Sequence, residues 1–219
     1  MKIDPSVLDF LTRLNENNNR DWFHLNKEEF EKSKSIVENF VFTLIAGIKT
    51  FDPQIGLLTP KDCMFRIYRD VRFSKDKLPY KTNFGGYIVK DGKSGNYAGY
   101  YLHIQPGQSF LAGGIYQPSP EVLKKVRQEI AFNLNEFKEL LFDITFKKYF
   151  KEITGEKLVR MPKEYARDFG EEELLKFKSY VVMHEVPDKL LLSDGFYPHC
   201  LEVFKAMMPV NHFFNHAID

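Results

Sequence analysis

The sequence predicts an α+β protein in which an antiparallel β-meander is packed by N-terminal and C-terminal helices. Apolar residues recur at helical spacing near both ends of the chain, whereas its middle is rich in β-branched and aromatic residues. Short connections join the middle segments, and these favour antiparallel hairpins over β–α–β units. We expect a single domain over residues 1–219.

The N-terminal part is predicted to hold two helices. Asp4 is a good capping residue, and Pro5 suits the first turn of a helix. A polar break over residues 15–19 follows, and a longer helix is expected from Asn26, with Glu29 completing a capping box. Their apolar faces are Val7, Phe10, Leu11 and Leu14 in the first helix, and Val37, Phe40, Val41, Leu44, Ile45 and Ile48 in the second.

Strands are predicted in the middle of the chain, over residues 65–73, 86–90, 97–104 and 109–116. Residues 91–96 and 105–108 contain Gly, Asp, Asn and Pro, which is typical of hairpin loops. A further strand is expected over residues 177–186.

Helices are predicted again after position 118. Ser119 and Pro120 form a start signal, and Asn133 with Glu136 forms a second possible capping box. The charged stretch 145–176 is expected to form short solvated helices and loops. A helix over residues 198–208 and a separate last helix from near Pro209 complete the prediction.

Bulk composition excludes several classes of protein. Hydrophobic residues make up 43% and charged residues 28% of the 219 residues, which argues against disorder. A formal net charge of +1 argues against a domain that coats nucleic acid. Cys63 and Cys200 are far apart and are expected to be reduced and buried, which suits the cytoplasm. With no visible signal peptide and no long apolar stretch, we expect a soluble cytoplasmic protein that does not enter the membrane.

The most informative segment is residues 65–81, which we call the basic-aromatic run. It contains three Arg, three Lys, two Asp and four aromatic rings. Six cations and two carboxylates give it a local charge of +4, so the other 202 residues sum to −3. Such a concentration of positive charge attracts anions.

The predicted strand 65–73 would place Arg66 and Arg72 on its polar face and Arg69 on its apolar face. A buried guanidinium needs a carboxylate, carbonyl groups or a ligand, so we assign Arg69 and Asp70 to a structural network. The outer residues are available to bind a phosphate- or carboxylate-bearing small molecule, with Gly85 and Gly86 permitting close backbone approach. The candidate ligand-binding residues are Arg66, Arg72, Lys77, Tyr80 and Lys81.

Two alternatives stay open at this point. The run fits a module that binds nucleic acid or an acidic protein, because aromatic rings interspersed with Arg suit stacking on bases. It also fits a purely structural buried Arg/Asp network. The reaction type, if there is a reaction, the cofactor and the oligomeric state are not specified by the sequence.

The run resembles the bacterial family known as domain of unknown function 2461 (DUF2461). The resemblance implies one domain of about this length and a bacterial cytoplasmic setting, and it implies no particular activity, cofactor or partner. It lies in Arg66, Arg69, Asp70, Arg72, Phe73, Asp76, Lys77, Tyr80 and Lys81, in residues 19–23 and 100–104, and in Gly113, Gly114 and Pro118.

Three further groups of residues each fit more than one role. Trp22 and Phe23 suit either a ligand ring or, more simply, a hydrophobic staple on the core. His103, close to tyrosines on a predicted strand, suits either acid–base chemistry or a structural hydrogen bond. His212 and His216 have the spacing of a helical metal pair, but no third ligand is near them in the sequence, so no metal site is predicted.

Overall fold

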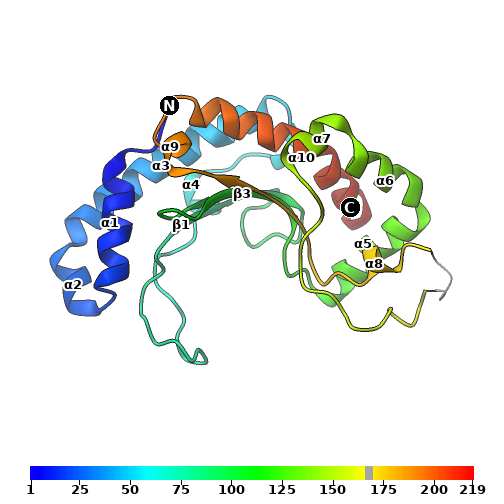
Figure 1. The fold of residues 1–219 in the computed structure, drawn as a ribbon, viewed down its shortest axis with the longest axis horizontal. Coiled ribbons are helices and arrows are strands. Elements are labelled where there is room, and N and C mark those ends of the chain that lie inside the picture. The colour runs from blue at the N-terminus through cyan, green and yellow to red at the C-terminus, as the bar shows by residue number, and fades with distance from the viewer. Residues whose placement is uncertain (166–169) are drawn as a thin grey trace.

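The computed structural model of the protein describes residues 1–165 and 170–219 and confirms the predicted fold class (Figure 1). Within these residues, ten α-helices accompany one antiparallel sheet of four strands in the order β1-β2-β3-β4. The strands are β1 (Phe84–Ile88), β2 (Gly99–Ile104), β3 (Ser109–Ile115) and β4 (Tyr180–Val186).

The register of the sheet determines which side chains share a face. Gly85 pairs with His103, His103 pairs with Phe110, and Phe110 pairs with Glu185. Because side chains alternate along a strand, the residues two positions away from these, such as Tyr101, lie on the same face. Strands β1 to β3 form the predicted meander, and β4 joins β3 after a long helical segment.

The N-terminal helices are α1 (Pro5–Glu16), α2 (Arg20–Leu25) and α3 (Lys27–Lys49). The predicted cap is present, because an Asp4 side-chain oxygen accepts from the backbone nitrogen of Ser6 at 3.0 Å. The predicted apolar faces of α1 and α3 are buried. The capping box at Asn26 is absent, since its side-chain amide donates instead to the carbonyl oxygen of Trp22 at 2.8 Å, at the end of α2.

The start signal at Ser119 is confirmed, because its hydroxyl accepts from the nitrogen of Val122 at 3.3 Å. The capping box at Asn133 is absent, since this side chain donates to Glu129 in the preceding helix. The remaining helical elements are η1 (Pro53–Ile55), α4 (Pro60–Cys63), α5 (Pro120–Phe132), α6 (Leu134–Phe142), α7 (Ile144–Tyr149), α8 (Glu172–Leu175), α9 (Asp188–Leu191) and α10 (Phe196–Ile218).

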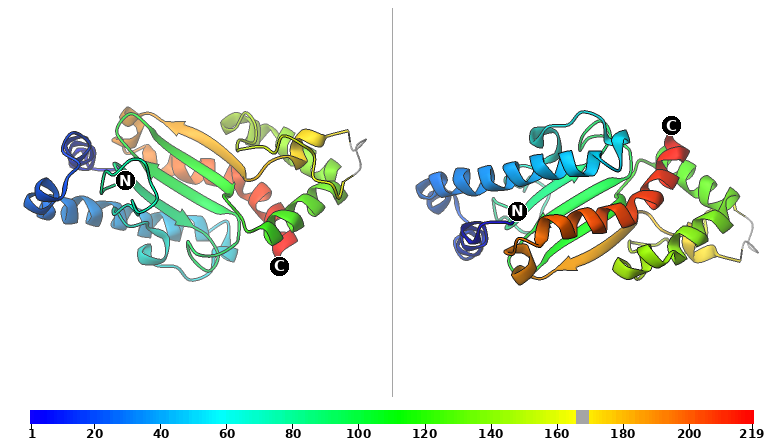
Figure 2. Two further views of the ribbon diagram at one scale, coloured as in Figure 1. Left: turned by 90° about the horizontal axis from the view of Figure 1, so that it is seen from below. Right: turned by 90° about the horizontal axis from the view of Figure 1, so that it is seen from above.

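A separate last helix from Pro209 was a wrong prediction, because α10 continues through this residue. A proline inside a helix removes one backbone hydrogen bond, at a cost of roughly 3 kcal/mol. Buried side chains on both sides of it, including Phe204, Met207 and Phe213, offset that cost. The helix changes direction in its second half (Figure 2).

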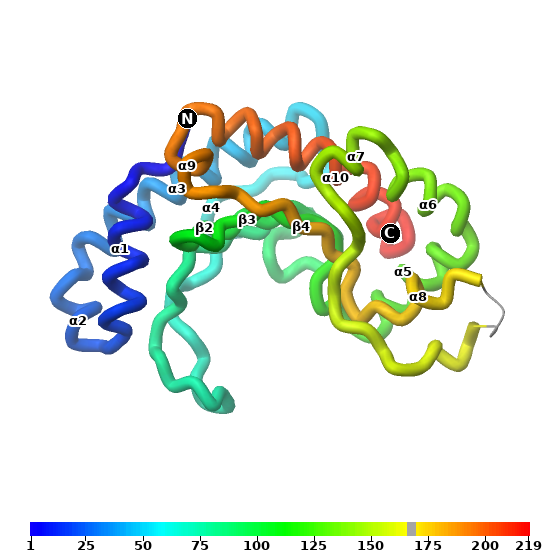
Figure 3. Tube along the Cα trace, viewed as in Figure 1, coloured from blue at the N-terminus to red at the C-terminus, as the bar shows by residue number. Residues whose placement is uncertain are grey.

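Helices α3 and α10 lie side by side on one face of the sheet, and the core fills the space between (Figure 2). No helix of the described residues covers the opposite face in Figure 1, and we call it the uncovered face. Tyr101, His103 and Phe110 lie on it, because they alternate with Tyr100, Leu102 and Leu111, which are buried in the core. Helices α1 and α2 flank one end, and α5 and α8 flank the other (Figure 3). None of the helices in the described ranges combines the length and the apolar composition that a membrane span requires.

Candidate functional site

The predicted strand 65–73 was wrong. Residues 64–82 form a projecting loop, which we call the arm (Figures 1 and 3). Two backbone hydrogen bonds join its two sides. The backbone nitrogen of Lys81 donates to the carbonyl oxygen of Ile67 at 2.8 Å, and that of Arg69 donates to the carbonyl oxygen of Pro79 at 2.9 Å. Only isolated bridges result, such as the one between Tyr68 and Tyr80.

Local hydrogen bonds at the arm tip explain why no strand forms there. A carboxylate oxygen of Asp70 accepts from the backbone nitrogen of Arg72 at 3.2 Å, and one of Asp76 accepts from that of Leu78 at 3.0 Å. Such bonds from a side chain to the backbone two residues on favour turns over extended pairing. Backbone hydrogen bonding across the arm therefore ends at Arg69.

The two aspartates of the run also neutralise two of its arginines. Arg69 pairs with Asp76 at 2.5 Å, and Arg72 pairs with Asp70 at 2.6 Å. The hydrogen bond from Arg72 lowers the pKa of Asp70, and the bond from the backbone of Leu78, followed by that from Arg69, lowers the pKa of Asp76. Arg69 is not buried in an apolar face, because the side chain is 26% exposed. Arg69 and Asp70, which the sequence assigned to one structural network, therefore belong to two different ion pairs near the surface.

Tyr80 anchors the base of the arm. Its ring stacks on Phe23 of α2 with centroids 4.0 Å apart, and the side chain is buried. The side chain of Asn18 forms two hydrogen bonds with the backbone of Tyr80. It accepts from the Tyr80 nitrogen at 3.1 Å and donates to the Tyr80 carbonyl oxygen at 3.0 Å. The interpretation of the Trp22–Phe23 pair as packing on the core therefore holds for Phe23. Asn18, in the polar break over residues 15–19, has a role that the sequence did not indicate.

Arg66 and Lys81 are the cations of the run that lie together. Neither forms an ion pair with a described carboxylate, although Arg66 lies near enough to Asp70 for its positive charge to help lower the pKa of that carboxyl group. Lys81 is half-buried, and its Nζ lies 5.2 Å from the centre of the Phe65 ring. Burial lowers the pKa of Lys81, and the positive charge of Arg66 lowers it further. An anion placed between the two would relieve this repulsion.

Next to these cations, His103 is held in one tautomer on the uncovered face. Its Nε2 lies 2.9 Å from the side-chain oxygen of Gln105, so this nitrogen carries the proton. Its Nδ1 therefore accepts, from the hydroxyl of Tyr101 at 3.1 Å and from the amide of Asn83 at 3.4 Å. The ring stacks on Phe110 with centroids 4.4 Å apart.

Burial sets the protonation states of this cluster. It lowers the pKa of His103, although the hydrogen bond to Gln105 opposes the shift, so the imidazole is neutral at pH 7. Burial, with a contribution from Tyr116, raises the pKa of Tyr101 to about 12. Phe65, beside Lys81, contacts Tyr101 edge-on with centroids 6.3 Å apart, which joins the cations to the Tyr101–His103 pair.

The structure thus distributes the five sequence-predicted ligand residues over three places. Arg66 and Lys81 lie together beside the uncovered face, and Tyr80 is packed against α2. Arg72 and Lys77 lie toward the arm tip, where Lys77 donates to the carbonyl of Val71 at 2.9 Å.

Comparison with known proteins gives one match. Residues 6–213 match the model of the family described as "Conserved hypothetical protein (DUF2461)". The chain belongs to the DUF2461 family. Neither a search of curated proteins nor one of solved structures found a match.

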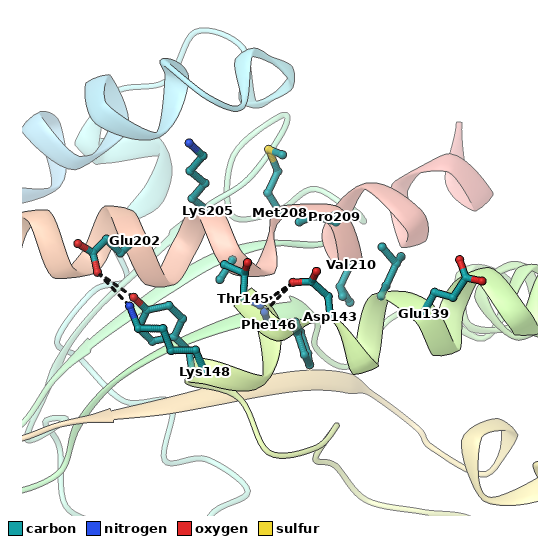
Figure 4. A pocket seen from close by; sticks show the side chains of 13 residues that line it. Glu139, Asp143, Thr145, Phe146, Lys148, Glu202, Lys205, Met208, Pro209 and Val210 are labelled. Atoms are coloured by element: carbon teal, nitrogen blue, oxygen red, sulfur yellow. Dashed lines mark hydrogen bonds and ion pairs between the residues drawn. The ribbon is translucent and has the colours of Figure 1, made fainter.

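This DUF2461 protein also has a groove of 780 Å³ between α10 and the helices α6 and α7 (Figure 4). Two of its acids already have partners. Glu202 accepts from the hydroxyl of Tyr149 at 2.8 Å and pairs with Lys148, and Asp143 caps α7 through two backbone nitrogens. We therefore do not take it as the functional site.

The helical histidine pair does not form a metal site in the DUF2461 structure. His212 bonds instead to Asp52, with its Nε2 3.0 Å from a carboxylate oxygen, and Asp52 also accepts from the buried hydroxyl of Tyr100 at 2.6 Å. No group of three or more potential metal ligands is found within residues 1–165 and 170–219.

A different histidine pair was missed by the sequence analysis. His184 of β4 and His199 of α10 place their Nε2 atoms 3.0 Å apart. His184 contacts the carbonyl oxygen of Tyr149 through Nδ1, so Nδ1 carries its proton and Nε2 accepts from His199. Fifteen positions separate the two residues, and no local pattern signals their contact.

The contact between His184 and His199 predicts that the protein becomes less stable in mild acid. Burial, followed by the neighbouring His184, lowers the pKa of His199, while Glu202 opposes and Lys148 adds to the shift. The unfolded chain therefore binds a proton near pH ~6.5, before the folded protein does, so the free energy of unfolding falls as the pH drops below that value. His103 shifts in the same direction. Urea unfolding at a series of pH values measures the effect.

Two variants show whether the acid sensitivity comes from the His184–His199 pair or from other titrating groups. His199→Gln should flatten this acid limb, whereas His24→Gln, at an exposed position of α2, should leave it unchanged. Equal profiles for wild type and His199→Gln would contradict the assignment.

Proposed function

We propose that this DUF2461 protein binds a small molecule bearing a phosphate or carboxylate group on the uncovered face of its sheet. Arg66 and Lys81 hold the anion, and the Tyr101–His103 pair lies next to the bound molecule. The observation that carries the proposal is the half-buried Lys81 beside Arg66, with no described carboxylate in an ion pair with Lys81. Unpaired cations held close together are costly unless an anion joins them.

The neighbouring groups fit a polar ligand with an apolar part. Phe65 is 39% exposed and Phe110 is half-buried, so both rings can contact a ligand. A neutral His103 with its Nδ1 toward Tyr101 can accept a proton through that hydroxyl. In this proposal Tyr80 positions the arm, while Arg72 and Lys77 lie toward its tip.

A thermal-unfolding screen with phosphates, nucleotides and carboxylates at constant ionic strength tests the proposal. A ligand at 100 times its dissociation constant adds about 2.7 kcal/mol of stability. We expect Arg66→Met and Lys81→Met each to remove most of that gain, because each deletes one of the two charges. Lys75→Met, which removes an exposed cation of the same run, is the matched control and should keep it. Equal losses in Lys75→Met and Lys81→Met would overturn the proposal in favour of diffuse charge attraction.

A second candidate function, binding of single-stranded nucleic acid, is favoured by the arm tip. Phe73 is 95% exposed there, and Tyr68 is 50% exposed, with Arg72 and Lys77 close in sequence. Exposed rings among cations suit stacked bases and phosphates. This candidate requires that a single-stranded DNA oligonucleotide binds with an affinity that falls steeply with salt and is lost in Phe73→Ala. The small-molecule proposal requires neither.

We also propose a bacterial cytoplasmic setting and a single domain over residues 1–219. Cys63 and Cys200 are both free and buried, which supports a reducing compartment. One cluster of buried residues runs from Ile3 to Phe214, which supports the single domain.

A further inference from the structure

A second unpaired cation lies at the other end of the sheet. Arg127 of α5 is 7% exposed, and its Nη2 donates to the carbonyl oxygen of Phe177 at 2.9 Å. Its Nε is buried and has no hydrogen-bond partner among the described residues. No described carboxylate forms an ion pair with it either. A buried guanidinium with an unbonded Nε and no described carboxylate partner is rare, because neutral partners compensate the desolvation of the charge only in part.

Arg127 borders a cavity of 660 Å³, which is large enough for a small molecule. The cavity lies between the start of α5, the segment around Thr154 and the strand residue Val181. Lys178 and Tyr116 also line it, and Tyr116 is 69% exposed. Glu156, a carboxylate that also lines the cavity, is paired with Lys178, so Arg127 is the lining charge without an ion-pair partner among the described residues.

The surroundings of Arg127 favour a negative ligand. The first turn of α5 borders the cavity through Pro120, and the N-terminus of a helix carries partial positive charge. Burial raises the pKa of Tyr180, whereas the positive charge of Arg127 and a hydrogen bond with its side chain oppose this rise, which places the guanidinium next to the Tyr180 hydroxyl. Gln117, also in the cavity wall, has a φ of 47°, a strained conformation of the kind found at ligand sites.

We propose that this cavity is a second anion site, in which Arg127 binds the carboxylate or phosphate group of a small molecule. A planar guanidinium offers paired donors that match either group. The site is separate from the one formed by Arg66 and Lys81, and it does not depend on that proposal.

Nuclear magnetic resonance titration of the full-length protein tests this site. Inorganic phosphate and succinate are the two probes, and sodium chloride at equal ionic strength is the reference. In the wild type, the Arg127 Nε–H signal and the amide signals of Gln117 and Ser179 should shift saturably with at least one probe. An Nε–H signal that follows ionic strength alone overturns the proposal. Comparison of the responses to phosphate and to succinate shows whether the site prefers a phosphate or a carboxylate group.

Variants assign the response to the cavity. Arg127→Met should weaken binding by roughly tenfold or more, because it deletes the charged partner of the anion. Lys124→Met, which removes an exposed cation of the same helix, should change binding less than twofold. Lys81→Met should also leave the signals of Gln117 and Ser179 responsive, so failure of the first proposed site is distinguishable from failure of this one.

A second variant keeps the test decisive if Arg127→Met does not fold. Thr154 is exposed at the cavity wall, so Thr154→Trp fills the space without removing the cation. It should abolish the saturable shifts. If Thr154→Trp binds the probe as tightly as the wild type does, the assignment of the ligand to this cavity is overturned.

Discussion

Gly114→Ala is expected to lower the free energy of unfolding by about 4 kcal/mol or more. Gly114 has a φ of 102°, which side chains rarely adopt, and a Cβ built on it would lie 2.0 Å from the carbonyl oxygen of Tyr180. That oxygen belongs to the backbone of β4, which cannot yield without separating from β3. Urea denaturation followed by circular dichroism measures the loss.

Gly107→Ala is the matched control for this prediction. Gly107 has a φ of 68°, but nothing lies within 4 Å of its would-be Cβ. Its substitution therefore tests the backbone conformation alone and should cost about 1 kcal/mol. Similar losses in the two variants would show that the close contact between Gly114 and Tyr180 is not what makes glycine necessary there.

Asn211→Leu is expected to cost about 2–6 kcal/mol, since it leaves two buried backbone groups unpaired at ~1–3 kcal/mol each. Asn211 is 1% exposed and lies on α10. Its side-chain oxygen accepts from the nitrogen of Gly114 at 2.8 Å, and its side-chain nitrogen donates to the carbonyl of Gly99 at 3.1 Å. Leucine has a similar volume but can form neither bond.

The same urea experiment checks this prediction, with Lys205→Leu as its control. Lys205 is an exposed residue of the same helix, so its substitution should change stability by less than about 0.5 kcal/mol. If Asn211→Leu is as mild as Lys205→Leu, the two hydrogen bonds contribute little to the attachment of α10 to the sheet.

The elements predicted correctly are those specified by near neighbours in the sequence. Asp4 and Ser119 cap helices through residues two or three positions away, and the apolar stripe of α3 is a local period. The predictions failed where another interaction competed. At residues 65–73, the carboxylate of Asp70 bonded to the backbone and ended the extended pattern. At Pro209, burial of the flanking residues carried the helix through a proline.

The candidate sites likewise combine a part that the local sequence predicts and a part that depends on contacts between distant residues. The charge of the run predicted Arg66, Arg72 and Lys81 as ligand residues alike, but Arg72 is paired with Asp70, and the sequence does not show which arginine each aspartate pairs with. Arg127 gave no signal, because its position next to the apolar stripe of α5 is ordinary for a solvated side chain. Its burial depends on Phe177, 50 positions away. Long-range packing of this kind cannot be read from periodicity.

The two buried thiols have a practical consequence for measuring the position of the arm in solution. Burial raises the pKa of Cys63 to about 12 and raises that of Cys200 well above its usual range, so neither presents a reactive thiolate. A maleimide dye should therefore attach selectively to a cysteine introduced at the exposed position Phe73. Energy transfer from Trp22, the single tryptophan of the chain, to that dye would then follow the distance between α2 and the arm tip in solution.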